Sequence, residues 1–309
     1  MAATVPFDND SLNAALKTIW GQYRTWAITS RKYKNEVSRW RKIVLWLSIS
    51  GAILGTLSQQ LPTWGVVTAE SWWSRGIGFA GGIALGLAAF FTKEIFRPDS
   101  EGRAVRARAA AEALKSQAYL IATGAPPYDS ASTDLFAKPD RVTKAVENLP
   151  SVTLQPEQKL ERLISAPMTV EDYVQQRVDD QIKYYTDSAI ANEKKIATGR
   201  LLSWTFGAAG VILGFLATQR SSAAAWVAVI GTITAAIAAQ QYSGRYQFLI
   251  LTYQAAMEEL GELKNRWVGE RKNLGVAADH KLVLAVEKVI TAENSAWMVE
   301  WTKKTDKQP

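Results

Sequence analysis

The sequence contains no cysteine and a single histidine, His280. Without cysteine there are no disulfide bonds, no thiol catalysis and no cysteine-ligated metal sites. A lone histidine at the start of a predicted helix has no second ligand, so we expect His280 to be a solvated side chain. The chain also lacks a P-loop, a Gly-x-Ser-x-Gly nucleophile motif and a dinucleotide-binding motif on a strand–helix turn. We therefore expect no enzymatic activity, no catalytic or metal-binding residues and no cofactor.

Charge is also missing, but only locally: four stretches hold no Asp, Glu, Lys or Arg, namely residues 43–58, 76–92, 201–218 and 223–239. At 16 to 18 residues each, they would span roughly 25 Å as helices, the short end of what a bilayer needs. Buried helices of a soluble bundle are the alternative. The four uncharged stretches are placed in two pairs with tryptophan at the flanks, which favours transmembrane helices over about 43–60, 76–93, 201–219 and 223–241.

The two pairs are an internal repeat. Residues 51–60 (GAILGTLSQQ) return 159 positions later as residues 210–219 (GVILGFLATQ), with six identical positions. The repeat predicts two tandem units of two transmembrane helices each, 1–122 and 169–309. Six of the ten prolines lie between Thr123 and Pro167, so residues 123–168 are predicted to be a Pro-rich cytoplasmic linker with short helices.

The net charge of +7 is concentrated beside these stretches. Sixteen Lys and Arg residues flank their inner ends, whereas the two hairpin tips carry only Arg75 and Arg220. This positive-inside bias predicts a multi-pass protein of the cell (inner or plasma) membrane with both termini cytoplasmic. The basic flanks indicate contacts with anionic lipid headgroups rather than nucleic acid. No removable signal peptide is evident, so the first stretch is predicted to be an uncleaved anchor.

The charged parts of the chain read as long helices with narrow apolar seams. In residues 12–40, apolar side chains recur every three or four positions, a coiled-coil period, and residues 170–200 and 242–267 carry similar seams. We therefore predict an all-α membrane protein whose transmembrane helices extend into a cytoplasmic coiled-coil-like bundle. An acidic run in 170–200, from Glu171 to Asp187, is interpreted as a solvated face interleaved with Arg177 and Lys183.

Glycine is spaced four apart within three of the uncharged stretches. Such small-residue faces let transmembrane helices approach closely, within a hairpin or between subunits. The predicted helix-packing residues are Gly51, Gly55, Gly78, Gly82, Gly86, Gly210 and Gly214.

Weakly polar side chains are the only other polar groups in the membrane stretches. The absence of an ionisable group at mid-bilayer disfavours a proton-coupled transporter. Hydrogen bonding between helices is the favoured interpretation; lining a water-filled pore in an oligomer is the sharper one. The candidate pore residues are Thr56, Gln60, Gln219, Thr232, Thr234 and Gln240.

The second unit resembles the SLATT family of two-transmembrane effectors in residues 173–185 (YVQQRVDDQIKYY), in Ala189-x-x-Asn192 with the hairpin that follows, and in Glu293-Asn294-x-x-Trp297. The first unit resembles a second SLATT subtype through its long basic helix and hairpin. This resemblance implies an oligomeric, pore-forming or membrane-perturbing effector of a bacterial conflict or antiphage system, with a separate nucleotide-signalling or sensor partner, since the chain carries no recognisable sensing domain. The alternative is a non-enzymatic membrane scaffold that recruits cytoplasmic partners through its helices.

Overall fold

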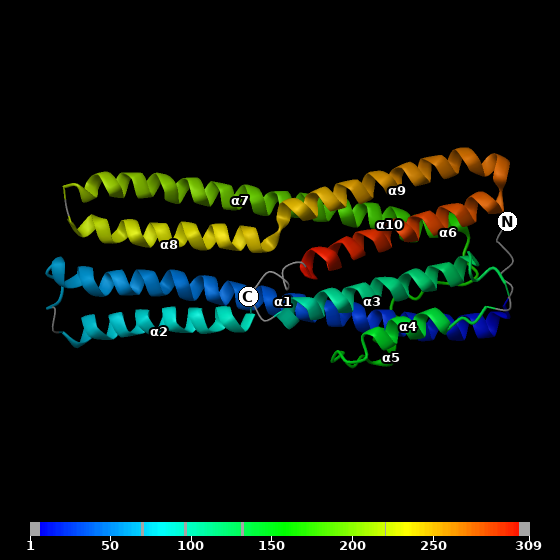
Figure 1. Ribbon diagram of the computed structural model, residues 1–309, viewed down its shortest axis with the longest axis horizontal. Coiled ribbons are helices and arrows are strands. Elements are labelled where there is room, and N and C mark those ends of the chain that lie inside the picture. The colour runs from blue at the N-terminus through cyan, green and yellow to red at the C-terminus, as the bar shows by residue number, and fades with distance from the viewer. Residues whose placement is uncertain (1–6, 69–70, 96–97, 131–132, 220, 303–309) are drawn as a thin grey trace. The chain divides into compact units, whose positions relative to one another are not determined.

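The computed structural model describes residues 7–68, 71–95, 98–130, 133–219 and 221–302. All regular structure in this part of the chain is helical, which confirms the predicted all-α class. The helices, labelled in Figure 1, are α1 (Asn9–Thr63), α2 (Trp72–Ile95), α3 (Pro98–Thr123), α4 (Ala137–Ala145), α5 (Pro156–Leu160), α6 (Val170–Tyr173), the π-helix η1 (Val174–Asp179), α7 (Asp180–Ala217), α8 (Ser221–Gly244), α9 (Tyr246–Leu274) and α10 (Val276–Thr302).

The helices belong to two compact units. The bundle unit comprises Met1–Asn35, Pro98–Ala189 and Leu251–Pro309, and the hairpin unit comprises Glu36–Arg97 and Ile190–Ile250. Helices α1 and α7 each run from the bundle unit into the hairpin unit without a break. The prediction that the first long helix continues directly into the first transmembrane stretch is confirmed by the 55-residue helix α1.

Local sequence signals account for the helix ends. The carboxylate of Asp8 accepts hydrogen bonds from the backbone N–H groups of Asp10 and Ser11, at 3.3 and 3.1 Å, and so caps α1. The hydroxyl of Thr169 accepts a hydrogen bond from the backbone N–H of Asp172 at 3.1 Å and so caps α6. After α1 the backbone reverses at Gly65, whose φ of 72° lies in the region that glycine enters without strain.

The core of the bundle unit is made of the predicted seams. In α1 the buried seam residues are Leu12, Leu16, Ile19, Trp26 and Tyr33. In the second repeat they are Val170, Val174, Val178, Tyr185 and Ala189, followed in α9 by Tyr253, Ala256, Leu260 and Trp267. Helix α10 packs along α3 and adds Val283, Val286 and Ile290 to the core. The 3.5-residue spacing thus identified the buried faces of these helices.

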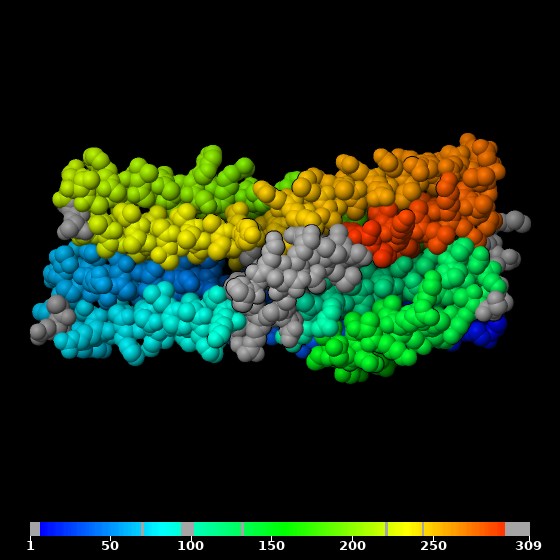
Figure 2. Space-filling view, viewed as in Figure 1, coloured from blue at the N-terminus to red at the C-terminus, as the bar shows by residue number. Residues whose placement is uncertain are grey.

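Part of the predicted linker lies against α1 as a strap, defined here as residues 146–164. The hydroxyl of Tyr33 donates to the carbonyl oxygen of Pro150 at 2.5 Å, and the indole N–H of Trp20 donates to the carbonyl oxygen of Glu161 at 3.1 Å. Between these contacts the backbone N–H of Val152 donates to the hydroxyl of Thr29 at 3.0 Å. Figure 2 shows α4 and α5 (green) on the surface.

Replacing Thr29 with valine is expected to loosen the strap. The side chain is 1% exposed and keeps its shape, but the backbone N–H of Val152 loses its acceptor, which costs about 1–3 kcal/mol. Limited proteolysis should therefore cut the strap faster in Thr29→Val. The matched control is Thr18→Val, because Thr18 is exposed on the same helix and its hydroxyl donates only to the carbonyl of Ala14. Equal cleavage rates in the two variants would show that the strap does not depend on this bond.

Each of the four uncharged stretches lies in a helix long and apolar enough to cross a membrane. Within the most apolar window of each helix, between 0 and 17% of the residues are buried, so the side chains face outward. Large apolar groups accordingly lie open, such as Phe79, Trp204 and Val211 at 73 to 74% exposure. Exposing so many large apolar side chains to water would cost free energy, whereas the hydrocarbon core of a membrane solvates them. The chain is a membrane protein.

Candidate functional site

In the first hairpin, α1 and α2 approach closely at glycine. A Cβ atom built on Gly81 would lie 2.8 Å from the backbone nitrogen of Gly55 and 3.1 Å from the carbonyl oxygen of Gly51. A Cβ atom on Gly51 would lie 3.0 Å from the carbonyl oxygen of Gly81, and one on Gly78 would lie 3.1 Å from the hydroxyl oxygen of Ser58. Gly51 and Gly78 are therefore at the helix contact, with Gly55 contributing its backbone. Gly81, which the four-residue spacing did not single out, makes the closest approach to main-chain atoms of α1.

The other glycines of the predicted stripe are not at this contact. A Cβ atom on Gly82 or Gly86 would meet no atom within 4 Å. The buried positions of α2 are Ser74, Gly81, Ala84 and Ala88. They are seven, three and four residues apart, which fits the 3.5-residue seam of a left-handed helix pair. A strict spacing of four drifts away from such a seam by about 40° per step, so Gly82 and Gly86 point outward.

The second hairpin, formed by α7 and α8, repeats this arrangement in a looser form. A Cβ atom on Gly210 would lie 3.3 Å from Cγ2 of Ile230 on α8, whereas one on Gly214 would meet nothing within 4 Å. The neighbouring helices are seen in Figure 1. Gly210 thus lies at the helix contact of this hairpin, and Gly214 lies on an open face.

The six candidate pore residues lie on separate elements of the hairpin unit: Thr56 and Gln60 in α1, Thr232, Thr234 and Gln240 in α8, and Gln219 just after α7. The hydroxyls of Thr232 and Thr234 donate to carbonyl oxygens of their own helix, those of Ala228 and Ile230, at 3.0 and 2.9 Å. Such bonds satisfy a hydroxyl in lipid without a neighbouring helix. Gln60 is 7% exposed and Gln219 is exposed, and both lie at outer helix ends. Thr56 and Gln240 are partly exposed.

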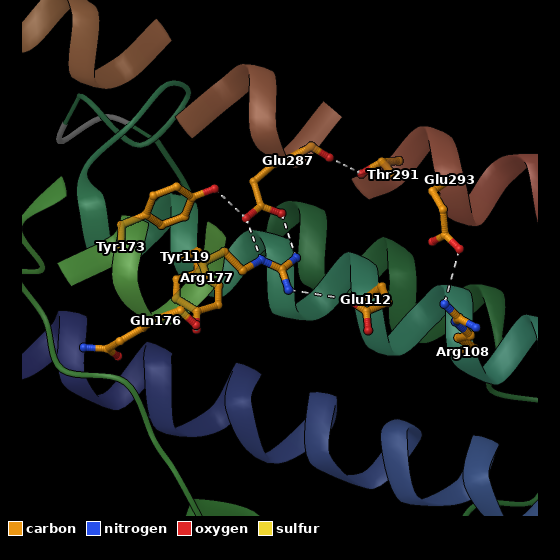
Figure 3. A network of polar contacts seen from close by, with 9 residues as sticks. All are labelled: Arg108, Glu112, Tyr119, Tyr173, Gln176, Arg177, Glu287, Thr291 and Glu293. Carbon is orange, nitrogen blue, oxygen red and sulfur yellow. Dashed lines mark hydrogen bonds and ion pairs between the residues drawn. The ribbon is translucent and has the colours of Figure 1, made fainter. Parts of the chain in front are cut away.

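The bundle unit holds a cluster of buried charges centred on Arg177 in η1. Its guanidinium is fully buried and forms two hydrogen bonds of 2.9 Å with the carboxylate of Glu287 on α10. The remaining terminal nitrogen lies 3.6 Å from the carboxylate of Glu112 on α3. The paired, planar geometry suits arginine and two carboxylate oxygens. We call Arg177, Glu287 and Glu112 the charge cluster; it joins α3 of the first repeat to η1 and α10 of the second (Figure 3).

Tyrosines and a second ion pair surround the charge cluster. The hydroxyl of Tyr173 donates to Glu287 at 3.0 Å, and the guanidinium of Arg177 lies 5.2 Å from the ring centroid of Tyr119. Farther along α3 and α10, Arg108 and Glu293 are 3.4 Å apart, as Figure 3 also shows. Helices α3 and α10 are therefore linked directly by the Arg108–Glu293 pair and indirectly through the buried Arg177 of η1.

The electrostatics keep the charge cluster ionised. Burial acts to lower the pKa of Arg177, but Glu287 and Glu112 outweigh it and hold that pKa well above its usual range. For Glu112, burial acts to raise the pKa, and the nearby cations, Lys115 first, bring it below its usual value. Burial together with Glu287 raises the pKa of Tyr173, so its hydroxyl stays protonated and donates. These groups hold the helices of the bundle unit together.

The interpretation of Arg177 as part of a solvated face was wrong, although its neighbour Lys183 is exposed. The sequence did contain a signal: Arg177 lies four positions after Tyr173 and three after Val174, on the apolar face of the helix. The acidic run is also less free than expected. Glu171 pairs with Arg271 at 2.5 Å, and Asp179 pairs with Lys264 at 2.6 Å.

His280 is also placed differently from the prediction of a solvated side chain. Its ring is partly buried, and its Nε2 atom is inaccessible and has no hydrogen-bond partner among the described residues. Within the described ranges, no group of three or more His, Asp or Glu side chains is arranged to hold a metal ion. Trp297, quoted in the family resemblance, lies where side chains are outside the described part of the chain.

The surroundings of Lys115, beside the charge cluster, predict how the free energy of unfolding depends on pH. Burial, and then Arg177, lower its pKa from 10.5 to about 8. Between these two values the unfolded chain binds a proton that the folded chain does not, so stability should rise with pH over about 8 to 10.5. Replacement of Lys115 with methionine should remove this rise and stabilise the protein more at pH 7 than at pH 10. Free energies of unfolding at both pH values test this; an effect of the substitution that is the same at both would contradict it.

Two family models match the chain. Residues 173–297 match the one described as SMODS and SLOG-associating 2TM effector domain 1, a range that contains Arg177, Glu287 and Glu293. Residues 24–134 match the one described as a protein of unknown function (DUF4231), which is a SLATT-like two-transmembrane region. This range contains all of α2 and α3, with Glu112, and most of α1. No curated protein and no solved structure matches the chain.

The two matched ranges coincide with the two copies of the sequence repeat, and each contains one of the paired membrane-competent hairpins. The chain therefore carries a SLATT two-transmembrane effector domain in its second half and a SLATT-like two-transmembrane region in its first.

Proposed function

We propose that this protein is a non-enzymatic effector of a bacterial conflict or antiphage system that assembles from several copies and permeabilises or perturbs the cell membrane. The observation that carries this proposal is the two-transmembrane effector domain at residues 173–297 on a chain with four membrane-competent helices. Such an effector makes the membrane of an infected cell leaky and thereby stops the growth of that cell.

Assembly from several copies is supported by small residues that no part of the same chain covers. Gly82, Gly86 and Gly214 have no atom within 4 Å of a built Cβ position. Open small-residue faces let transmembrane helices pack against helices of another molecule. In the proposed assembly the conducting path forms between several copies and is lined by Thr56, Gln60, Gln219, Thr232, Thr234 and Gln240.

The proposal includes an orientation and partners. The basic residues at the inner helix ends place both termini in the cytoplasm and bind anionic lipid headgroups. The activating signal comes through a separate cytoplasmic partner, a nucleotide-signalling enzyme or sensor, which acts on the helices of the bundle unit.

Membrane potential is the direct test. Induced expression should depolarise bacteria, and purified protein should release dye from liposomes that contain anionic lipid. Gly214→Leu should reduce both effects by filling the open face of α7. Val211→Leu is the matched control, since Val211 is 74% exposed on the same helix and already bears a large side chain. Unchanged potential and intact liposomes with correctly inserted protein would refute the proposal.

A membrane scaffold is the second candidate, and one observation favours it. Apolar side chains outside the membrane helices lie open on α9 and α10: Val268, Val276 and Leu284 are 56, 47 and 41% exposed. Such residues are candidates for binding another protein's helix. A scaffold would bind a cytoplasmic protein through them and leave liposomes sealed, which the dye-release experiment distinguishes.

A further inference from the structure

One turn of the second repeat departs from α-helical geometry. Helix α6 continues into the π-helix η1 (Val174–Asp179), which continues into α7. In a π turn each N–H bonds the carbonyl five residues earlier, so the turn contains an extra residue; such turns are rare and often lie at functional sites. The first repeat has no counterpart, because α1 is α-helical from Asn9 to Thr63.

Contacts from two other helices hold this π turn. Arg177, in its middle, is bound through both sides of its guanidinium, by Glu287 of α10 at 2.9 Å and by Glu112 of α3 at 3.6 Å. The hydroxyl of Tyr119 on α3 also donates to the backbone carbonyl of Gln176 at 3.4 Å. An uncommon backbone geometry persists where surrounding contacts determine it. The charge cluster is therefore in a position to decide between π and α geometry at η1.

Conversion of the π turn to α geometry has a defined consequence for α7. In α geometry the six residues of η1 would extend the helix by one residue position more than they do as a π turn. Each residue of α7 would therefore move to the place that the following residue occupies now. That is a rotation of about 100° and an advance of about 1.5 Å. Because α7 runs unbroken from Asp180 to Ala217, its membrane-spanning part would turn as well.

We propose that η1 is a register switch, in which loss of the Arg177–Glu287 pair converts the π turn to α geometry and rotates α7. The proposal rests on the proposed effector function for its biological meaning, since a rotating third transmembrane helix is a gating step. The rotation itself can be measured without any conductance.

The chain has no cysteine, so a single introduced thiol reports on one position. Ala189 on α7 is 7% exposed and would move to the place of Ile190, which is 45% exposed. Ser188, partly exposed, would move to the buried place of Ala189. In detergent-solubilised full-length protein, adding Glu287→Gln should raise maleimide labelling of Ala189→Cys on the order of fivefold and lower that of Ser188→Cys, because labelling follows thiol exposure.

Opposite changes at neighbouring positions identify a rotation. If both labelling rates rise, the helix has unfolded locally, and if neither changes, the register is fixed; either result overturns the proposal. Glu112→Gln provides a milder second variant, since Glu112 is the more distant partner of Arg177, and should change the two rates in the same opposite directions to a smaller extent.

Deletion of Gln175, an exposed residue of η1, supplies the matched control. It removes the extra residue, so the turn becomes α-helical while α7 keeps its place. In this background Glu287→Gln should leave both labelling rates unchanged. If the labelling shows the rotation but the protein does not depolarise cells, the effector function is refuted and the register switch stands. If the protein depolarises cells but the labelling shows no rotation, the register switch is refuted and the effector function stands.

Discussion

Replacing Arg177 with methionine is expected to lower the free energy of unfolding by about 3–5 kcal/mol, because it leaves the buried carboxylate of Glu287 without its partner. The carboxylate of Glu287 is 5% exposed and loses two hydrogen bonds of 2.9 Å, and Glu112 loses its nearby guanidinium. Tyr173 still donates to Glu287 but does not neutralise its charge. Denaturant titration of the detergent-solubilised protein, followed by tryptophan fluorescence, measures the loss.

Lys264→Met is the matched control for this substitution. Lys264 also pairs with a carboxylate, Asp179 at 2.6 Å, but the two side chains are 35 and 43% exposed. Solvent screens such a pair, so its loss should cost less than about 1 kcal/mol. In the double variant Arg177→Met with Glu287→Met the total loss should be smaller than the sum of the single losses by about 2 kcal/mol, because no uncompensated charge remains at Glu287. Equal losses for Arg177→Met and Lys264→Met would contradict the assignment of Arg177 to a buried cluster.

Gly81→Leu is expected to disrupt the first hairpin, and Gly81→Ala to destabilise it by about 1–3 kcal/mol through overpacking. Even the single added Cβ atom would lie 2.8 Å from the backbone nitrogen of Gly55 and 3.1 Å from the carbonyl oxygen of Gly51. These are main-chain atoms, which cannot rotate away as a side chain would, so the helices must separate. The midpoint of thermal unfolding and the amount of protein in the membrane fraction measure the effect.

The neighbouring glycine provides the control for this prediction. Gly82→Ala places the same methyl group one residue along α2, where nothing lies within 4 Å. Its thermal midpoint should be unchanged or raised, since alanine favours the helix over glycine. A Gly82→Ala variant as unstable as Gly81→Ala would show that the close approach at Gly81 does not determine the outcome.

Periodicity in the sequence predicted most of the fold because helical seams are a local property. The steps of three and four between Leu12 and Tyr33 and the four uncharged stretches specify helices and their buried sides directly. The internal repeat likewise predicted paired hairpins, and the structure contains four membrane-competent helices. These features require no knowledge of which helix packs against which.

The charge cluster could not be predicted in the same way, because it depends on long-range pairing. Arg177 and Glu287 are 110 residues apart in the chain, and neither belongs to a spacing rule that would identify its partner. A lone arginine among acidic residues looks like part of a solvated face until the opposing helix is known. Gly81 was missed for a related reason: its importance comes from the main chain of α1, which the sequence of α2 does not reveal.

The position of Glu287 near the end of the chain has a consequence for the order of biosynthesis. A ribosome makes Glu112 and Arg177 well before it makes α10, and by then both hairpins have already emerged. In the nascent chain Arg177 therefore lacks the carboxylate of Glu287 until α10 has been translated. Premature termination anywhere before α10 would release a product with inserted hairpins and an open bundle, the kind of species that quality-control proteases recognise by its exposed interior.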